Sequence, residues 1–286
     1  MEAKILDGKA IAAAMKEEIS AQVAAFKEKY GKVPGIAVVQ VGADPASSRY
    51  VKQIGKSFEE AGMTFRLETL DESASEAQVV GLVDSLNADA GVNGIIVQMP
   101  LPKHISQEAI AATISPAKDV DGINPINAGR LLAGTGEYFA PATPSGGMEI
   151  LHRSGIEIKG KNAVVVGRSN IVGKPMAMML LHEHATVTIC HSRTRDLPAV
   201  TRGGDILVAA IGKARMITGD MIKPGAVVVD FGINVLEGKV VGDVDFESAR
   251  TVAGAITPVP GGTGPMTNIV LMRNTISAAV KAAERV

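Results

Sequence analysis

The residues whose types and spacing most clearly suggest a binding site follow an apolar run near the middle of the chain. Val164–Val166 stop at Gly167, and Gly173-Lys174-Pro175 lead into the helix-forming run 176–181. A buried strand that breaks through glycine into a helix start presents backbone N–H groups and the positive end of the helix dipole to an anion. This pattern is typical of a pyrophosphate site in a dinucleotide-binding domain. Because Ser169 stands at the second glycine position of the G-x-G-x-x-G fingerprint, a packing turn without a ligand is the alternative interpretation.

The residues after the next predicted strand indicate which dinucleotide is bound. That strand ends at Cys190, and the segment His191–Arg195 contains two arginines, a serine and a threonine, with no acid before Asp196. Proteins that bind NAD usually place an acid on the ribose about 20 residues past the first glycine. Guanidinium and hydroxyl groups instead attract a 2′-phosphate. We therefore expect NADP, with Ser192 and Arg193 in its site and Arg168 adding charge, although Arg195 could simply be a solvated side chain.

Polar side chains also follow predicted strands in the first half of the chain. Tyr50 lies in the early turns of a predicted helix, Gln98 ends a strand, and Asp119 and Asp121 share a loop. Each has an ordinary alternative, namely a capped helix, an amide bonded to a neighbouring loop, and a structural turn. Ligands of parallel sheets bind beyond the carboxyl ends of the strands. These side chains are therefore candidates to line a cleft between two domains.

Other chemistries find little support in the sequence. His182 and His184 are two apart on a predicted helix and so face different ways, while His104 and His152 lack partners at ligand spacing. We therefore expect surface histidines and no metal site. No Ser–His–Asp order or Cys–His pair indicates a nucleophile. The single cysteine, Cys190, is expected to be a buried strand residue.

Composition excludes several classes of protein. The 286 residues are 46% hydrophobic and 21% charged, as in a globular protein with room for two domains. With a net charge of −1, the chain has no excess of positive charge that would favour binding to nucleic acid or to an anionic membrane. No apolar run reaches the roughly 18 residues of a membrane helix, and the N-terminus does not read as a signal peptide. With one cysteine, these features predict a cytoplasmic protein.

Strands alternate with helices in both halves, which predicts an α/β fold with two parallel sheets covered on both faces. The expected strands are 35–41, 63–70, 94–98, 163–166, 186–190, 206–211 and 227–230, and a short element at 221–222 is expected between the last two. The expected helices are 7–29, 46–61, 75–88, 106–114, 147–154, 174–184, 197–202 and 265–285. The Pro- and Gly-rich stretch 137–147 reads as a linker. It separates a first domain, 1–140, from a Rossmann-like domain, 141–264.

Eight motifs together resemble one enzyme family over nearly the whole chain. They are VGADPASSRYV, VQMPLP, KDVDGINP, TPSGG, VVVGRSNIVGKPM, CHSRT, GDVDF and TPVPGGTGPMTN. In this order they are similar to the methylenetetrahydrofolate dehydrogenase/methenyltetrahydrofolate cyclohydrolase family. The resemblance implies a homodimer of two-domain chains, with folate in the cleft and the terminal helix 265–286 on the first domain. It also implies hydride transfer from 5,10-methylenetetrahydrofolate to NADP⁺, followed in most members by hydration to 10-formyltetrahydrofolate.

The resemblance assigns roles to individual residues. It implies that Tyr50 lies against the aminobenzoyl ring, Gln98 by the reacting carbon and Asp121 on the pterin. The residues that it implies for NADP are Gly167, Arg168, Ser169, Ser192 and Ile233. Two nitrogen lone pairs assist departure of the hydride, so the protein mainly has to position donor and acceptor.

One position departs from the family pattern. The family places a lysine four residues after the tyrosine, and here that residue is Ile54. An aliphatic side chain cannot move a proton, and Lys52 and Lys56 lie on other faces of the helix. We therefore expect a dehydrogenase with weak or absent cyclohydrolase activity. The alternatives are a fully bifunctional enzyme with another group in that role, a non-catalytic folate- or nucleotide-binding relative, and a dehydrogenase of another small substrate.

Overall fold

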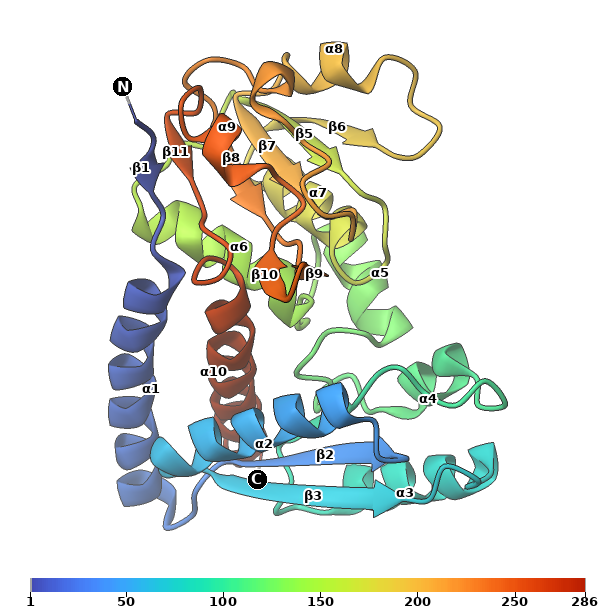
Figure 1. Cartoon of the computed structure of the whole chain (residues 1–286). Helices are drawn as coiled ribbons and strands as arrows, with labels where there is room; N and C mark the ends of the chain where they lie inside the picture. The colour runs from blue at the N-terminus through green and yellow to red at the C-terminus, as the bar shows by residue number, and fades with distance from the viewer. Residues whose placement is uncertain (1, 286) are drawn as a thin grey trace. The chain divides into compact units, whose positions relative to one another are not determined.

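The computed structural model describes residues 2–285 and divides the chain into two compact units (Figure 1). Unit 1 comprises the chain through Ala13 together with Thr143–Thr267, and unit 2 comprises Ala14–Ala142 together with the chain from Asn268 onward. The N-terminal residues were expected in the first domain. They instead supply a strand of unit 1, because residues 4–5 pair with residues 255–256.

Unit 1 is built on a six-stranded parallel sheet with the order β1-β11-β8-β7-β5-β6. Its strands are β1 (Lys4–Ile5), β5 (Asn162–Val166), β6 (Thr186–Cys190), β7 (Ile206–Ala209), β8 (Val227–Asp230) and β11 (Ala255–Ile256). Its helices are α6 (Ala142–Arg153), α7 (Gly173–His182), α8 (Leu197–Thr201), α9 (Phe246–Ala249) and the 3₁₀ turn η1 (Gly219–Met221). Successive strands joined by helices give the parallel arrangement that the sequence predicts.

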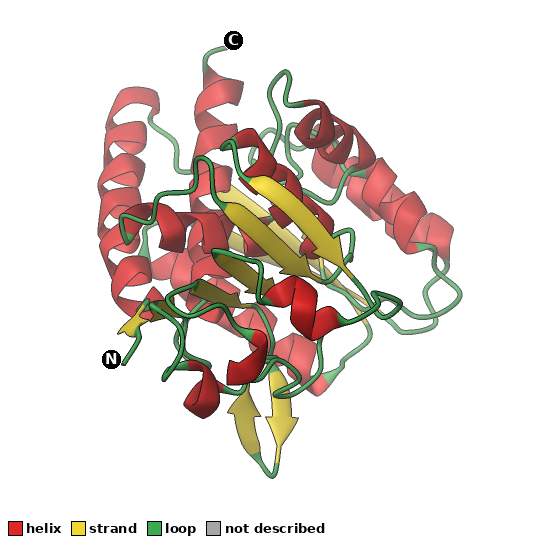
Figure 2. Cartoon of the chain, turned by 90° about the horizontal axis from the view of Figure 1, so that it is seen from above, coloured by secondary structure: helices red, strands yellow, loops and turns green. Residues whose placement is uncertain are grey.

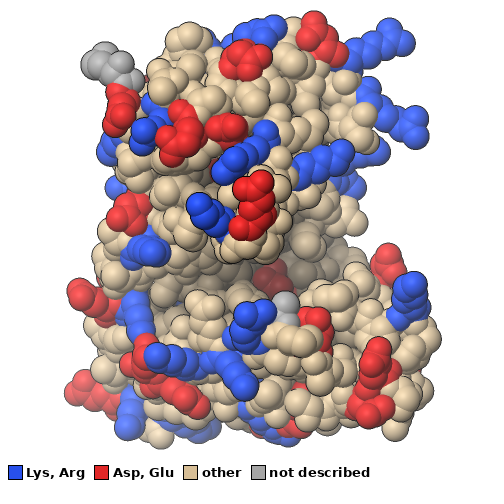
Figure 3. All heavy atoms as spheres, viewed as in Figure 1, with Lys and Arg blue, Asp and Glu red and all other residues tan. Residues whose placement is uncertain are grey.

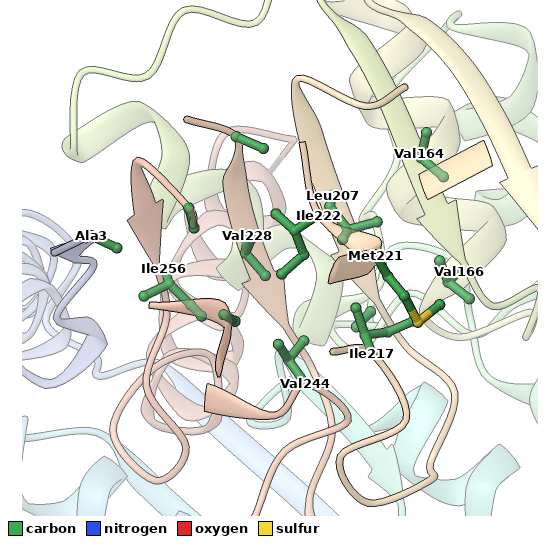
Figure 4. Packing of buried hydrophobic residues seen from close by; sticks show 14 of the residues in the cluster. Ala3, Val164, Val166, Leu207, Ile217, Met221, Ile222, Val228, Val244 and Ile256 are labelled. Carbon is green, nitrogen blue, oxygen red and sulfur yellow. The ribbon is translucent and has the colours of Figure 1, made fainter. Parts of the chain in front are cut away.

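The apolar run of β5 is explained by burial on both faces of this sheet. Val164 and Val166 belong to one hydrophobic cluster, shown in Figure 4, whereas Ala163 and Val165 belong to a second cluster. Because successive strand side chains point to opposite faces, a strand covered on both sides is apolar throughout. The sheet is thereby held between two packed layers, and the carboxyl ends of its strands share one edge.

A two-stranded hairpin stands apart from the six-stranded sheet (Figure 2). It consists of β9 (Asn234–Leu236) and β10 (Lys239–Val241), which pair antiparallel. The two connecting residues, Glu237 and Gly238, have φ angles of 51° and 74°. Two positive φ angles in a two-residue loop are the mark of a type I′ turn. The sequence analysis did not predict this hairpin.

Unit 2 contains a three-stranded parallel sheet with the order β3-β2-β4. Its strands are β2 (Gly35–Val41), β3 (Thr64–Leu70) and β4 (Gly94–Val97). Its helices are α1 (Gly8–Tyr30), whose first residues lie in unit 1, α2 (Pro45–Glu60), α3 (Glu76–Ala88), α4 (Gln107–Thr113), α5 (Pro125–Ala133) and most of α10 (Gly264–Ala283). Every residue of the central strand β2 is buried.

The expected linker, 137–147, contains the boundary between the two units, which falls between Ala142 and Thr143, but its second half is helix and not loop. Residues 142–147 are the first half of α6 and most of them are buried. The glycines there allow close packing rather than flexibility. A Cβ at Gly146 would lie 2.6 Å from the Cβ of Met266, and one at Gly147 would overlap the Phe231 ring. Helix α5 was also missed, and the short element expected at 221–222 overlaps the end of η1.

Candidate functional site

The glycine turn after β5 is sterically obligatory. Gly167 has a φ of 138°, and a Cβ there would overlap the carbonyl oxygen of Ala210. A Cβ at Gly173 would overlap the carbonyl oxygen of Gly167. Strand, turn and helix therefore approach one another as closely as backbone allows, which is what a dinucleotide turn requires.

Ser169 organises the start of helix α7. Its Oγ accepts the N–H groups of Val172 at 3.1 Å and Gly173 at 3.2 Å, and its carbonyl accepts the N–H of Lys174 at 3.1 Å. Pro175 has no N–H to offer. Ser169 therefore accepts the N–H groups at the start of α7, and contact between this turn and an anion stays a prediction. Arg168 and Ser169 are themselves exposed.

A second tight turn follows β6 at the same edge of the sheet. Thr194 Oγ1 accepts the N–H of His191 at 2.9 Å, and the His191 ring accepts the N–H of Arg193 at 3.1 Å. This folding leaves Ser192 and Arg193 exposed, and basic side chains gather over the loop between β6 and α8 in Figure 3. The ordering role of His191 was missed, since the sequence marked it only as the first residue of the segment 191–195.

The first acid after this turn has a structural task. Asp196 caps α8, and its Oδ1 accepts the N–H of Ala199 at 3.2 Å. The turn that holds Ser192 and Arg193 therefore presents hydroxyl and guanidinium groups, and its nearest carboxyl in sequence is engaged at a helix start. This donor set fits a phosphate better than a ribose hydroxyl.

In unit 2, the buried side-chain amide of Gln40 holds the turn after β2 in place. Gln40 Nε2 donates to the carbonyl of Gly42 at 3.2 Å and to Ser48 Oγ at 2.8 Å. Asp44 caps α2 by accepting the N–H of Ser47 at 2.8 Å. Together these bonds fix the first turns of α2, which carry Tyr50. Gln40 was not among the residues that the sequence analysis selected.

Two of the predicted folate residues interact in the structure. Burial is the larger cause that raises the pKa of the Tyr50 hydroxyl, and the Asp121 carboxylate adds to it. Burial is the larger cause that raises the pKa of Asp121 to about 7, and the charge of Asp119 adds to it. One hydrogen bond from the N–H of Ala142 lowers the pKa. Asp121 is therefore a carboxyl that titrates near neutral pH beside a tyrosine.

The two aspartates of the loop 119–121 have different roles. Asp119 is fully buried and accepts N–H groups of Ile123 at 3.0 Å and Asn124 at 2.8 Å, and the Asn127 amide at 2.8 Å. Burial nonetheless raises its pKa. A carboxylate so fully bonded is a structural turn residue, as the ordinary alternative held. Asp121 is half-buried.

Gln98 directly follows β4 at the same edge as the turn after β2, because its N–H donates to the carbonyl of Val39 at 2.8 Å. Its side-chain Nε2 donates to the carbonyl of Met99 at 2.8 Å. Two interpretations were left open for this amide. The bond of its nitrogen agrees with the second, in which the amide bonds to a neighbouring loop.

Ile54 lies on the inner face of α2. Its exposed fraction is 0%, as are those of Val51 and Phe58, which share its helix face at spacings of three and four residues. Lys52 is exposed, and Lys56 is 78% exposed and pairs with Glu60 at 3.7 Å. Neither lysine replaces the side chain at position 54.

Two family models match the chain. The catalytic domain of tetrahydrofolate dehydrogenase/cyclohydrolase matches residues 6–121, and the NAD(P)-binding domain of the same family matches residues 141–283. The chain belongs to this family. It is 55% identical to the bifunctional protein FolD of Roseiflexus sp. over 280 residues, which cover 98% of this chain and 97% of the relative. The Moorella thermoacetica protein of the same name is also 55% identical, over 98% and 99% of the two chains.

Solved structures of the tetrahydrofolate dehydrogenase/cyclohydrolase family superpose closely. The Campylobacter jejuni FolD enzyme gives a TM-score of 0.96 at 46% identity and covers 97% of this chain and 99% of its own. The Trypanosoma brucei enzyme, complexed with NADP and an inhibitor, gives 0.94 at 37% identity over 99% of both chains. The expected family and α/β fold are thereby confirmed.

Two further findings concern membrane-spanning helices and metal sites. Within residues 2–285, no helix is both long and apolar enough to span a bilayer. In the same described residues, no group of three or more His, Cys, Asp or Glu side chains is arranged to hold a metal ion.

Proposed function

We propose that this chain oxidises 5,10-methylenetetrahydrofolate to 5,10-methenyltetrahydrofolate by transferring a hydride to NADP⁺, which becomes NADPH. The observation that carries this proposal is the half-buried Asp121 carboxyl, whose charge acts on Tyr50, at positions that the motif resemblance assigns to folate within the matched catalytic domain. Ionised Asp121 can accept two hydrogen bonds from the N–H edge of a pterin. Tyr50 offers its ring to the aminobenzoyl group, and Gln98 lies by the reacting carbon.

NADP is the cofactor that unit 1 fits. The exposed Arg168, Ser192 and Arg193 supply donors for the 2′-phosphate, and Asp196 is engaged as a helix cap. Gly167 and Ser169 form the close turn, and the exposed Ile233, after β8, is a further residue that the resemblance assigns to NADP. When bound, NADP⁺ supplies the hydride acceptor, so the side chains of this chain only orient the two reactants. The NADP complex of a 37% identical relative supports this choice.

We further propose that the cyclohydrolase step is weak or absent. Hydration of the methenyl cation needs a group that moves a proton, and such groups contribute about 10²–10⁴ in rate. Ile54, which replaces the family lysine, is buried and aliphatic. We also propose a cytoplasmic homodimer, which light scattering of the purified protein tests.

One observation favours a second candidate, a fully bifunctional enzyme. The Asp121 carboxyl has a pKa of about 7, so it could carry the proton that the missing lysine would move. In that case the unmodified protein hydrolyses methenyltetrahydrofolate rapidly, and Asp121→Asn abolishes this hydrolysis.

Assays of the two half-reactions test the proposal. NADPH absorbance should rise when methylenetetrahydrofolate and NADP⁺ are added, with NAD⁺ much less effective. Methenyltetrahydrofolate should decay at a rate close to that without enzyme. If micromolar protein forms no NADPH while still binding folate, the chain is a non-catalytic relative. If it reduces NADP⁺ only with another small alcohol or acid, the folate assignment is wrong.

A further inference from the structure

One buried carboxylate of unit 1 gathers the backbone after β7. Asp243 has an exposed fraction of 0%. Its Oδ2 accepts the N–H groups of Ile211 at 2.6 Å and Gly212 at 2.9 Å, and its Oδ1 accepts the N–H of Lys213 at 2.9 Å. Successive N–H groups around one anion form a nest of the kind that binds phosphates. Here the anion in the nest is a side chain of the protein itself.

The same carboxylate reaches the loop after β8. Asn234 Nδ2 donates to Asp243 Oδ1 at 2.9 Å. Asn234 follows Ile233, which is 70% exposed although it is a large apolar side chain. Asp243 therefore ties the loop 211–213 to the loop 231–234, and all four of its donors are N–H groups.

A second carboxylate fixes the backbone of Asp243. Asp230, the last residue of β8, is only 2% exposed. Its Oδ1 accepts the N–H groups of Gly232 at 2.7 Å and Asp243 at 3.0 Å, and its Oδ2 accepts that of Val244 at 2.9 Å. The two aspartates thus form one buried framework at the carboxyl end of β8.

Two glycines leave the room that this framework needs. A Cβ at Gly232 would lie 2.5 Å from the carboxyl carbon of Asp243, and one at Gly242 would overlap Asp230 Oδ2. Backbone therefore packs directly on both carboxylates. Hydrogen bonds to a buried charge are strong, and leaving one of their partners unpaired is costly, so the framework is rigid.

We propose that Asp243 is the positioning residue for the nicotinamide end of NADP: it sets the loops after β7 and β8 without touching the cofactor. This inference rests on the proposed function. Strands β7 and β8 follow β5 in the sheet order, and a dinucleotide held at the Gly167 turn extends along that edge. Because every donor is an N–H group, an amide at position 243 would set its own NH₂ against some of them.

Replacing the carboxylate by its isosteric amide tests the inference. Asp243→Asn should raise the Kd for NADPH, measured by fluorescence titration, at least about tenfold. The KM for methylenetetrahydrofolate should change less than about twofold, a selectivity that general loosening of the fold would not give. The matched control is Asp245→Asn. Asp245 caps α9 through the N–H of Ser248 at 3.2 Å, and asparagine caps equally well, so NADPH binding should not change.

A swapped pair gives a second readout. Asn234→Asp alone sets two carboxylates against each other and should weaken NADPH binding. In the double variant Asn234→Asp with Asp243→Asn, the new NH₂ at 243 faces a new acceptor at 234. The double variant should therefore bind NADPH more tightly than either single variant, which a purely additive loss of structure would not produce.

The possible outcomes separate the two proposals. If the unmodified protein binds NADPH and Asp243→Asn binds it within about twofold, the positioning role is wrong and the proposed function stands. If the unmodified protein neither binds NADPH nor reduces NADP⁺, the proposed function fails and this inference fails with it. Should Asp243→Asn not fold, Asn234→Ala removes one donor from a half-exposed side chain. It should weaken NADPH binding about threefold, and unchanged binding would refute the role.

Discussion

The side chain at position 54 separates two chemistries that the family usually combines. Hydride transfer needs donor and acceptor in place, whereas hydration of the product also needs a group that moves a proton. Tyr50 and Asp121, which we propose to hold the folate for the first step, are present. Ile54 is aliphatic, buried and on the inner face of α2, so it cannot serve the second. Under the proposed function, this one residue decides whether the product leaves as the methenyl or the formyl compound.

Restoring the lysine should add the missing activity. Ile54→Lys is expected to raise methenyltetrahydrofolate hydrolysis at least about tenfold, because burial lowers the pKa of a lysine toward neutrality. It should also lower the free energy of unfolding by about 1–3 kcal/mol, since it buries a charge. Ile54→Met is the control of similar length without an amine. Equal hydrolysis by the two variants would show that the amine is not responsible.

The pKa of Asp121 predicts how the dehydrogenase responds to pH. Burial and the charge of Asp119 raise the pKa of this carboxyl to about 7, and the N–H of Ala142 lowers it. Only the ionised form accepts two bonds from the pterin, so kcat/KM for methylenetetrahydrofolate should climb as pH rises through about 7. Asp121→Asn should give a lower and flat profile over the same range. A profile that keeps its rise in this variant would assign the titration to another group.

At the scale of elements, most boundaries could be predicted because local patterns determine them. β2 has the predicted bounds, and the caps at Asp7, Ser75 and Ser106 begin helices where the sequence placed them. The pairing of β1 with β11 could not be predicted, because its partners are far apart in the sequence. The hairpin β9–β10 and the helical part of the 137–147 stretch are local features that were missed: the first has only three-residue strands, and the second begins in a stretch rich in Pro and Gly.

The candidate site follows the same division. Residue types and motifs selected Tyr50, Asp121, Ser192 and Arg193. They could not reveal Gln40 or the framework of Asp230 and Asp243, whose partners lie up to 32 residues away. An aspartate alone in sequence looks the same whether it caps a helix or holds a loop, because only the fold brings its donors to it.

Two helical glycines should respond in opposite ways to alanine. Gly81 in α3 has open space around an added Cβ, so Gly81→Ala should raise the free energy of unfolding by about 0.5–1 kcal/mol through reduced backbone entropy. Gly147 in α6 meets the Phe231 ring, so Gly147→Ala should destabilise the protein by about 1–3 kcal/mol. Urea denaturation measures both. If both variants are stabilised, position 147 is a flexible linker after all.

For the whole molecule, the division into two units implies a division of labour. The glycine turn, the β6 turn and the carboxylate framework all lie in unit 1, whereas Tyr50, Gln98 and Asp121 lie in unit 2. Each set is organised by hydrogen bonds within its own unit, such as those of Ser169 and of Gln40. The two ligands should therefore be separable by mutation.

Crossed variants test this separation. Arg193→Gln in unit 1 should raise the Kd for NADPH about tenfold, because it removes a charged partner of the 2′-phosphate, and should reduce the preference for NADP⁺ over NAD⁺. Its affinity for folate should not change. Asp121→Asn in unit 2 should raise the Kd for a folate substrate about tenfold and leave NADPH binding within about twofold. Calorimetric titration of each variant with each ligand gives the four values. Loss of both affinities in either variant would mean that the two sites are not independent, since changes at distant sites without shared partners are otherwise additive.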